Sequence, residues 1–381
     1  MIVRAKPLYV CALRMKSGEL MGVRDLAPDV ADRITPRFIV PPQSERDSEL
    51  EPRLIVGERF PDVSRALSLH WPQRDALIEA TYLLDEFGRD RMGLWLPKMF
   101  ENARKANARP IPLVAVDDLL RDDLNGYKAC IDTAASLKFG VVFSSGDLAD
   151  AEIGHQALAA IEKLGLAASD CMVIADFHDA DFTNPDHVAP VIAGVLDTLQ
   201  SLASWQQIVF QGTNFPEKNP ADPGLHAIVP RNEWIAWKKA VGFAPETADH
   251  MIFGDYAADC AKIVFKGGGG APAIRHYRYA TPNAWLVQRG LDTGTHAAIM
   301  QAICQGILAS GEFAGRNFSS GDDYIFRTAK NAGGPGAARE WRAVNTNHHI
   351  TRVVTDVGGV RGVKFKEADS EPLTDQMVMF H

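Results

Sequence analysis

The sequence predicts an α/β fold: a (β/α)8 TIM-like barrel with a C-terminal α+β extension packed near the barrel mouth. Short continuous apolar runs alternate with longer amphipathic stretches over the first two-thirds of the 381 residues, a pattern typical of parallel strands covered by helices on both faces. The apolar runs number eight, the count that closes a barrel. A change of pattern in the last third of the chain predicts the extension.

Each predicted strand is a short apolar run bounded by loop-forming residues. In chain order the strands are expected at residues 7–13, 37–41, 76–83, 111–116, 139–144, 171–177, 207–212 and 250–256. Helix-like stretches between them cover residues 92–107, 151–165 and 187–203. In the last of these, Val188, Val191, Ile192 and Val195 recur at helical spacing, so we expect them to form one face that packs on the sheet.

The last third of the chain begins with a glycine-rich stretch, residues 265–272, which we interpret as a flexible turn. A predicted strand at residues 273–281 and a predicted helix at residues 296–311 follow. This pattern divides the chain into a barrel, residues 1–262, and an extension, residues 263–381, that completes or covers the barrel mouth.

Composition limits the class of protein. The chain is 46% apolar and 23% charged, as in globular proteins. A formal net charge of −8 makes nucleic acid an unlikely partner, because affinity for a phosphate backbone comes from a basic surface. The five cysteines are far apart and form no CxxC pair, which indicates reduced thiols and a cytoplasmic protein. No signal sequence and no apolar run of membrane-spanning length is found, so we expect no membrane association.

The carboxyl ends of the predicted strands carry polar side chains that a barrel would gather at one mouth. The stretch "CMVIADFHDADF" (171–182) runs from an apolar strand into Asp176, and the eighth strand ends in Asp255 and Tyr256. Glu79 lies at the third strand, and Thr213 follows the seventh. Such groups fit acid/base chemistry or ligand binding, and they fit equally well an ion-pair network that only orders the rim.

A metal site is not expected. Asp176, His178, Asp179 and Asp181 could offer oxygen and nitrogen ligands, but Asp179 faces away from the first two on an extended segment, and no HxH or HExxH motif accompanies them. The sequence identifies no cofactor.

Two C-terminal stretches are rich in arginine, aromatic residues and histidine. In residues 274–290, strand alternation places Arg278 opposite in facing to Tyr277 and Tyr279, so its guanidinium points either at an anion or into solvent. We interpret "WRAVNTNHHITRVV" (341–354) as extended, so that at most one of its two adjacent histidines reaches a given site. The repeated "FSSGD" (143–147 and 318–322) indicates turns or helix N-caps.

These segments together resemble the bacterial and bacteriophage "beta protein" family. The matching stretches lie between residues 15 and 350: MKSGEL, TNFP, RNEW, GDY, RYATPNAWLVQRG, FAGRNFSSGDDYI and WRAVNTNHHI. Two positions depart from the family pattern, because Thr213 and Asn214 stand where a serine is expected and Glu79 replaces an aspartate. If these positions touch a ligand, the departures indicate a different ligand.

The resemblance implies a biological role more than a chemistry. The phage member for which the family is named protects its host from killing by a partner phage protein, relatives occur beside phage-defence genes, and no catalytic activity is established for the family. The resemblance also implies recurrent polar positions, here Lys16, Glu19, Asp176, Arg231, Glu233, Asp255, Tyr256, Arg278, Tyr279, Arg289, Asp322, Arg342, Asn347 and His348.

Three functional hypotheses follow. The first is a binding protein of a phage-defence or toxin-neutralising module, whose polar mouth captures a toxin or phage protein, or a small anionic or peptide ligand. Its expected ligand-binding residues are Lys16, Glu79, Thr213, Asn214, Arg231, Tyr256, Tyr279, Arg289, Arg342 and Asn347.

The second is a hydrolase or lyase with Asp176 or Asp255 as general base and Arg278 or His348 stabilising negative charge. That hypothesis requires the two carboxylates to lie about 5–9 Å apart across an open cavity. The third, a nucleic-acid-processing protein, requires the arginines of residues 274–289 to line a continuous basic groove.

Overall fold

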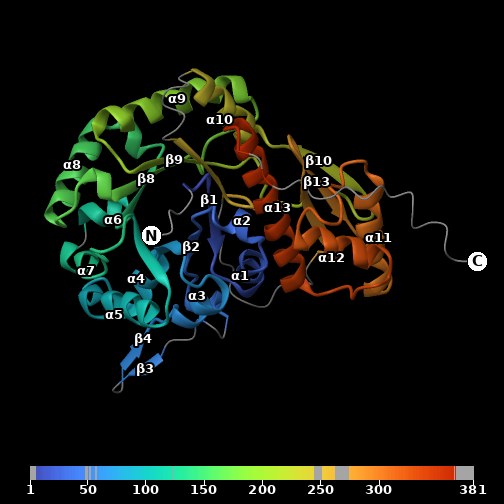
Figure 1. Cartoon of the computed structure of the whole chain (residues 1–381), viewed down its shortest axis with the longest axis horizontal. Coiled ribbons are helices and arrows are strands. Elements are labelled where there is room, and N and C mark those ends of the chain that lie inside the picture. The colour runs from blue at the N-terminus through green and yellow to red at the C-terminus, as the bar shows by residue number, and fades with distance from the viewer. Residues whose placement is uncertain are drawn as a thin grey trace, which may run out of the picture.

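The computed structural model describes residues 6–47, 50, 53–55, 58–121, 123–243, 251–261, 274–363 and 365. Eight parallel strands form a closed barrel in the order β1-β11-β9-β8-β7-β6-β5-β2 (Figure 1). The strands are β1 Tyr9–Arg14, β2 Arg37–Ile39, β5 Asp75–Glu79, β6 Arg109–Ala115, β7 Phe139–Ser144, β8 Cys171–Asp176, β9 Gln207–Gln211 and β11 Met251–Asp255. Each overlaps one predicted strand, so the predicted fold is confirmed.

The helices of the barrel follow these strands in chain order. They are α1 Ser17–Arg24, α2 Pro28–Ala31, α3 Ser64–His70, α4 Thr81–Phe87, α5 Met92–Lys105, α6 Val116–Arg121, α7 Leu124–Lys128, α8 Ala151–Lys163, α9 Pro185–Leu202 and α10 Asn232–Phe243. The described residues of this part also include a short hairpin, β3 Arg53–Ile55 with β4 Glu58–Phe60, and 3-10 turns at 43–45, 147–149 and 168–170.

The face predicted for α9 was wrong in part. Ala189, Ile192, Leu196 and Leu199 are buried, whereas Val191 is 55% exposed. Val191 precedes Ile192 by one residue and is therefore turned about 100° away on the helix. Leu196 and Leu199, which the prediction did not use, determine which face of α9 is buried.

A second, antiparallel sheet lies beside the barrel. Its order is β10-β13-β12, with β10 His226–Pro230, β12 His276–Ala280 and β13 Ala284–Arg289. Helices α11 His296–Ala309 and α12 Ser320–Ala329 pack against it, and their apolar side chains share a core with Tyr277 and Tyr279. The division of the chain at residue 262 stays a prediction, and β10 joins this sheet from before that residue. The glycine-rich stretch 265–272 lies outside the described residues.

The last of the described helices, α13 Ala338–Val360, connects the two parts (Figure 1). Its C-terminal half buries Ile350, Val353 and Val357 in the core between the barrel strands and their helices, so α13 is the helix that follows β11 in the barrel. Strands β12 and β13 with α11 and α12 are therefore inserted into the last strand-to-helix connection, whereas β10 comes from the connection between β9 and α10. The extended conformation predicted for residues 341–354 is wrong, because this stretch lies inside α13 and contains no glycine or proline to interrupt a helix.

Strand alternation sorts the polar side chains at the carboxyl end of the barrel. In β8, Met172 and Ile174 fill the interior, so Asp176 points inward as well. In β11, Met251 and Phe253 pack outward under the helices, so Asp255 faces outward. The two carboxylates expected to share one mouth lie on opposite faces of the barrel wall.

Among the described helices, none is long and apolar enough to cross a membrane.

Close contact between α1 and α13 generates a testable prediction. A Cβ atom added at Gly22 would lie 2.7 Å from the Cβ of Thr346 and 3.0 Å from the carbonyl oxygen of Ala343. Gly22→Ala should therefore lower the free energy of unfolding by about 1–3 kcal/mol through overpacking. Gly194→Ala in α9, where nothing lies within 4 Å, is the matched control and should raise stability by about 0.5–1 kcal/mol. Equal effects in chemical denaturation would contradict the close packing.

Candidate functional site

A buried arginine closes the interior of the barrel at its carboxyl end. Arg37 donates from Nε to Glu79 at 2.7 Å, and from Nη1 to Asp176 at 2.8 Å and Gln211 at 2.6 Å. The hydroxyl of Tyr256 donates to Asp176 at 2.6 Å. Burial opposes the charge of Arg37, but the carboxylates outweigh it and hold its pKa well above the ordinary value. Asp176 is thus held by hydrogen bonds within this group of side chains, which we name the Arg37 plug: Arg37, Glu79, Asp176, Gln211 and Tyr256.

Asp255 belongs to a separate network outside the barrel wall. It accepts hydrogen bonds from the hydroxyl of Tyr9 and, at 2.8 Å, from the backbone of Ala257. Nε2 of His349 lies 2.8 Å from its other oxygen, and the indole of Trp285 donates to Nδ1 of the same ring at 3.3 Å. Because an indole nitrogen only donates, Nδ1 is unprotonated and Nε2 carries the proton. Burial lowers the pKa of His349, which agrees with a neutral ring.

The neighbouring histidine points to a third network. His348 lies 2.8 Å from both Asp322 and the carbonyl oxygen of Ala280, and its ring stacks on Tyr279 at 3.8 Å. Tyr279 donates to Asp322 at 2.7 Å. Burial and the charge of Asp322 raise the pKa of Tyr279. This network joins β12, α12 and α13, and its three side chains are almost fully buried.

Arg231 and Glu233 precede and begin α10 and are both fully buried. Arg231 donates to the carbonyl oxygen of Thr281 at 2.9 Å and to Asp356 at 2.7 Å, but its Nε and Nη2 find no partner among the described residues. Glu233 accepts from the backbone of Asn214 at 2.9 Å, and its second oxygen likewise meets no described partner. Burial raises the pKa of Glu233 to about 8, although Arg231 opposes the shift.

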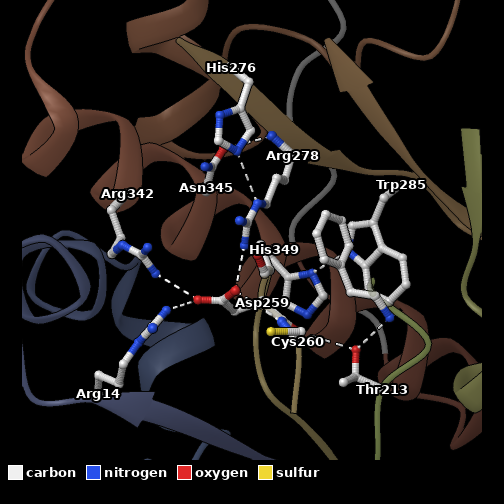
Figure 2. Close-up of polar contacts among 12 residues, drawn as sticks. Arg14, Thr213, Asp259, Cys260, His276, Arg278, Trp285, Arg342, Asn345 and His349 are labelled. Carbon is white, nitrogen blue, oxygen red and sulfur yellow. Dashed lines mark hydrogen bonds and ion pairs between the residues drawn. The ribbon is translucent and has the colours of Figure 1, made fainter. Parts of the chain in front are cut away.

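Three arginines converge on Asp259, which follows β11 (Figure 2). Arg278 donates to one carboxylate oxygen at 2.7 Å, and Arg342 donates to the other at 2.9 Å. Arg14, at the end of β1, forms an ion pair with the same second oxygen. Glu19 of α1 adds a second carboxylate, 3.1 Å from Arg342 and 3.4 Å from Arg14.

The pocket beside this cluster, named here the Asp259 pocket, has a volume of about 160 Å³. The first two turns of α13 contribute one helix face to it, through Ala338, Trp341, Arg342 and Asn345. The remaining lining residues come from α1, the segment after β11, and β12 with the residues before it: Glu19, Tyr256, Ala257, Ala258, Asp259, Ile274, His276 and Arg278, with Thr346 of α13. The pocket is open to solvent, since the Arg342 side chain is 36% exposed and that of Asp259 17%.

The electrostatics of the Asp259 pocket favour an anion. Burial and the nearby Arg342 lower the pKa of Arg278 to about 10, so it stays charged at neutral pH. His276 accepts from Nε of Arg278 at 3.2 Å and contacts the carbonyl oxygen of Ile274 through Nδ1 at 2.8 Å, while burial and Arg278 lower its pKa to about 4. His276 is therefore neutral, and three guanidinium groups face two carboxylates, an excess of one positive charge.

The residues predicted from the sequence are distributed over several places. Arg278 and Arg342 meet in the Asp259 pocket, with Tyr256 in its lining. Lys16 pairs with Glu45, and Arg289 contacts the carbonyl oxygen of Ala221 and Asp292. The networks described above contain Glu79, Asp176, Asp255, Tyr279, Arg231 and His348. The remaining three predicted residues connect neighbouring segments. Thr213 donates to the carbonyl oxygen of Asp259 at 3.3 Å, Asn214 donates to that of Pro230, and Asn347 bridges Gly22 and Gly321. Their functional roles stay predictions.

Several residues of these networks were missed by the sequence analysis. Arg37, Gln211, Asp259 and His276 were not selected, and His349 was passed over in favour of His348. Arg37 is the first residue of an apolar strand, a position where a charged side chain ordinarily faces solvent, and Asp259 lies three residues past the predicted strand end. Within the described residues, no group of three or more His, Cys, Asp or Glu side chains could hold a metal ion.

The raised pKa of Glu233 generates a prediction about pH. Its folded-state pKa of about 8 exceeds the ordinary value of 4.5, so the protonated group stabilises the folded state fully below pH 4.5, and this contribution is lost as the pH rises through 8. Between these values, the free energy of unfolding should fall by on the order of 1 kcal/mol per pH unit relative to Glu233→Gln. Denaturation at several pH values measures it. Glu312→Gln, on the exposed surface, should retain the wild-type slope, and a parallel slope in Glu233→Gln would refute the shift.

Comparison with known proteins identifies the family. No relative was found among curated proteins. Among solved structures, the chain is similar to the carboxyl transferase domain of pyruvate carboxylase from Rhizobium etli, determined with 3-bromopyruvate, at 10% sequence identity and a TM-score of 0.27. The alignment covers 92% of this chain and 48% of that one, so the chain spans about half the length of that structure. The model of the Beta protein family matches residues 9–355, and the chain therefore belongs to the Beta protein family.

Proposed function

We propose that this protein is a binding protein that captures an anionic group, carried by a partner protein or a small ligand, in the Asp259 pocket. The observation that carries the proposal is the convergence of Arg14, Arg278 and Arg342 from three separate elements on Asp259, beside an open pocket that Arg278 and Arg342 line. Guanidinium groups present paired donors that match a carboxylate or a phosphate.

Holding three guanidinium groups side by side costs free energy, and a bound anion would offset that cost. Burial removes water from the guanidinium groups of Arg14 and Arg278, and the nearby charge of Arg342 repels both, which is why their pKa values are lowered. Asp259 and Glu19 neutralise only two of the three charges. An anionic ligand would bring further negative charge to the three arginines, so binding and relief of repulsion act in the same direction.

The shape of the pocket supports a small anionic group with an apolar neighbour. Trp341 and Ile274 line it beside the arginines, and about 160 Å³ accommodates an acidic side chain or a chain terminus rather than a large cofactor. Membership of the Beta protein family supports a toxin or phage protein as the partner, because the resemblance to that family implies such a partner. We therefore propose a role in a phage-defence or toxin-neutralising module.

The geometry favours binding over the hydrolase or lyase alternative. That alternative needs Asp176 and Asp255 to face a common open cavity, but Asp176 is held inside the barrel by Arg37 and Tyr256. Asp255 is held outside the wall by Tyr9 and His349. Both carboxylates are almost fully buried, and neither lines the Asp259 pocket.

Binding of citrate and of a peptide rich in glutamate tests the proposal at constant ionic strength. Arg278→Gln and Arg342→Gln should each weaken the affinity measured by calorimetry about tenfold or more, because each removes a charged hydrogen bond. Arg316→Gln is the matched control, since Arg316 pairs with Asp323 outside the pocket. Asp255→Asn should lower the melting temperature without changing affinity. Equal affinity in all four variants would reject the pocket.

A phage panel plated on cells that express the protein tests the defence role. We expect the wild type and Arg316→Gln to reduce plaque formation by at least one phage, and Arg342→Gln to lose that protection, because the partner's anionic group would no longer be held. If Arg342→Gln protects as well as the wild type, the pocket has no part in the defence against phage.

A further inference from the structure

The Asp259 carboxylate already occupies the position that an anionic ligand needs. One of its oxygens accepts from Arg278 at 2.7 Å, and the other accepts from Arg342 at 2.9 Å and pairs with Arg14. This is the geometry of a carboxylate recognised through both oxygens by charged donors. We infer that Asp259 is an internal competitor for a carboxylate site: it holds the three guanidinium groups together in the free protein, and a ligand carboxylate takes its place. This inference rests on the proposed function.

The donors that point at Asp259 are shared with other acceptors. Nη1 of Arg278 is shared between Asp259 and the carbonyl oxygen of Ala258, and Nε of Arg278 donates to His276. Nη1 of Arg342 is shared between Asp259 and Glu19. An anion that added without displacement would be left with the outer guanidinium nitrogens and would lie against the like charge of Asp259. Displacement of Asp259 gives a ligand the donors that point into the cluster and moves the like charge away.

The attachment of Asp259 suits displacement of its side chain alone. Thr213 donates to the backbone carbonyl oxygen of Asp259 at 3.3 Å, so the main chain is anchored independently of the carboxylate. Apart from the arginines, the carboxylate accepts only from the adjacent backbone nitrogen of Cys260, at 3.0 Å, among the contacts of the described residues. The side chain is 17% exposed, so it borders solvent into which it can turn.

Glu19 differs in each of these respects. Its side chain is 5% exposed, it lies within α1, and only one of its oxygens contacts the arginines. Glu19 is therefore a fixed counter-charge. Glu19→Gln removes the same charge from beside Arg14 and Arg342 without vacating the carboxylate position, which makes it the matched control for Asp259→Asn.

The test compares the affinity of the wild type, Asp259→Asn and Glu19→Gln for glutamate, for citrate and for a peptide that ends in glutamate. Asp259→Asn should bind carboxylates about tenfold more tightly than Glu19→Gln, because its neutral amide competes only weakly with a ligand carboxylate for the guanidinium groups. Its melting temperature should be lower than that of the wild type in a chloride buffer and should rise more steeply with citrate. Preference for the peptide would assign the ligand to a protein partner, and preference for citrate or glutamate would assign it to a free acid.

The failures of the two ideas are distinguishable. If no variant binds any of these carboxylates, the proposed function is wrong. If the wild type binds them but Asp259→Asn binds no more tightly than Glu19→Gln, the pocket holds anions and Asp259 is a permanent part of it. Should Asp259→Asn fail to fold even with citrate, a structure of the wild type with citrate decides, because intact ion pairs of Asp259 with Arg278 and Arg342 would overturn the competition.

Discussion

The packing of α13 against α1 is the contact on which both parts of the molecule depend. Without side chains at Gly18 and Gly22, α1 lets α13 approach so closely that an added Cβ would lie less than 3 Å from it. The C-terminal half of α13 then completes the helical layer of the barrel, while its N-terminal half carries Arg342 and the lining of the Asp259 pocket. The position of one helix therefore fixes the fold and the pocket together.

Buried polar groups connect the barrel to the inserted sheet through pairs with specific geometry. Asp255 on β11 meets His349 on α13, and Asp322 on α12 meets His348 one residue earlier. Successive residues of a helix are turned by about 100°, so adjacent histidines reach two different networks. Buried pairs of this kind add little net stability, but a shift of α13 would leave charges unpaired, which makes them suited to fixing its position.

The sequence revealed the barrel well and the site less well, for physical reasons. Continuous apolar runs marked all eight strands because both faces of a parallel sheet are buried. Alternation along β8 and β11 could have separated Asp176 from Asp255, since Met172 and Phe253 have opposite facing. The helix across residues 341–354 was missed because its polar residues, buried against the inserted sheet, hide the usual amphipathic pattern. The cluster around Asp259 brings together residues from four segments that are distant in the sequence, and no local sequence pattern indicates such a cluster.

The Arg37 plug inside the barrel and the Asp259 pocket differ in how completely their arginines are paired. Arg37 is matched by two carboxylates and an amide oxygen, so its environment is complete without a ligand. The three arginines around Asp259 are incompletely matched, and they lie where solvent reaches them. The proposed binding site therefore lies away from the barrel axis, at the junction between β1, β12 and α13. Because that junction joins two parts of the chain, a ligand bound there would be coupled to the position of the inserted elements.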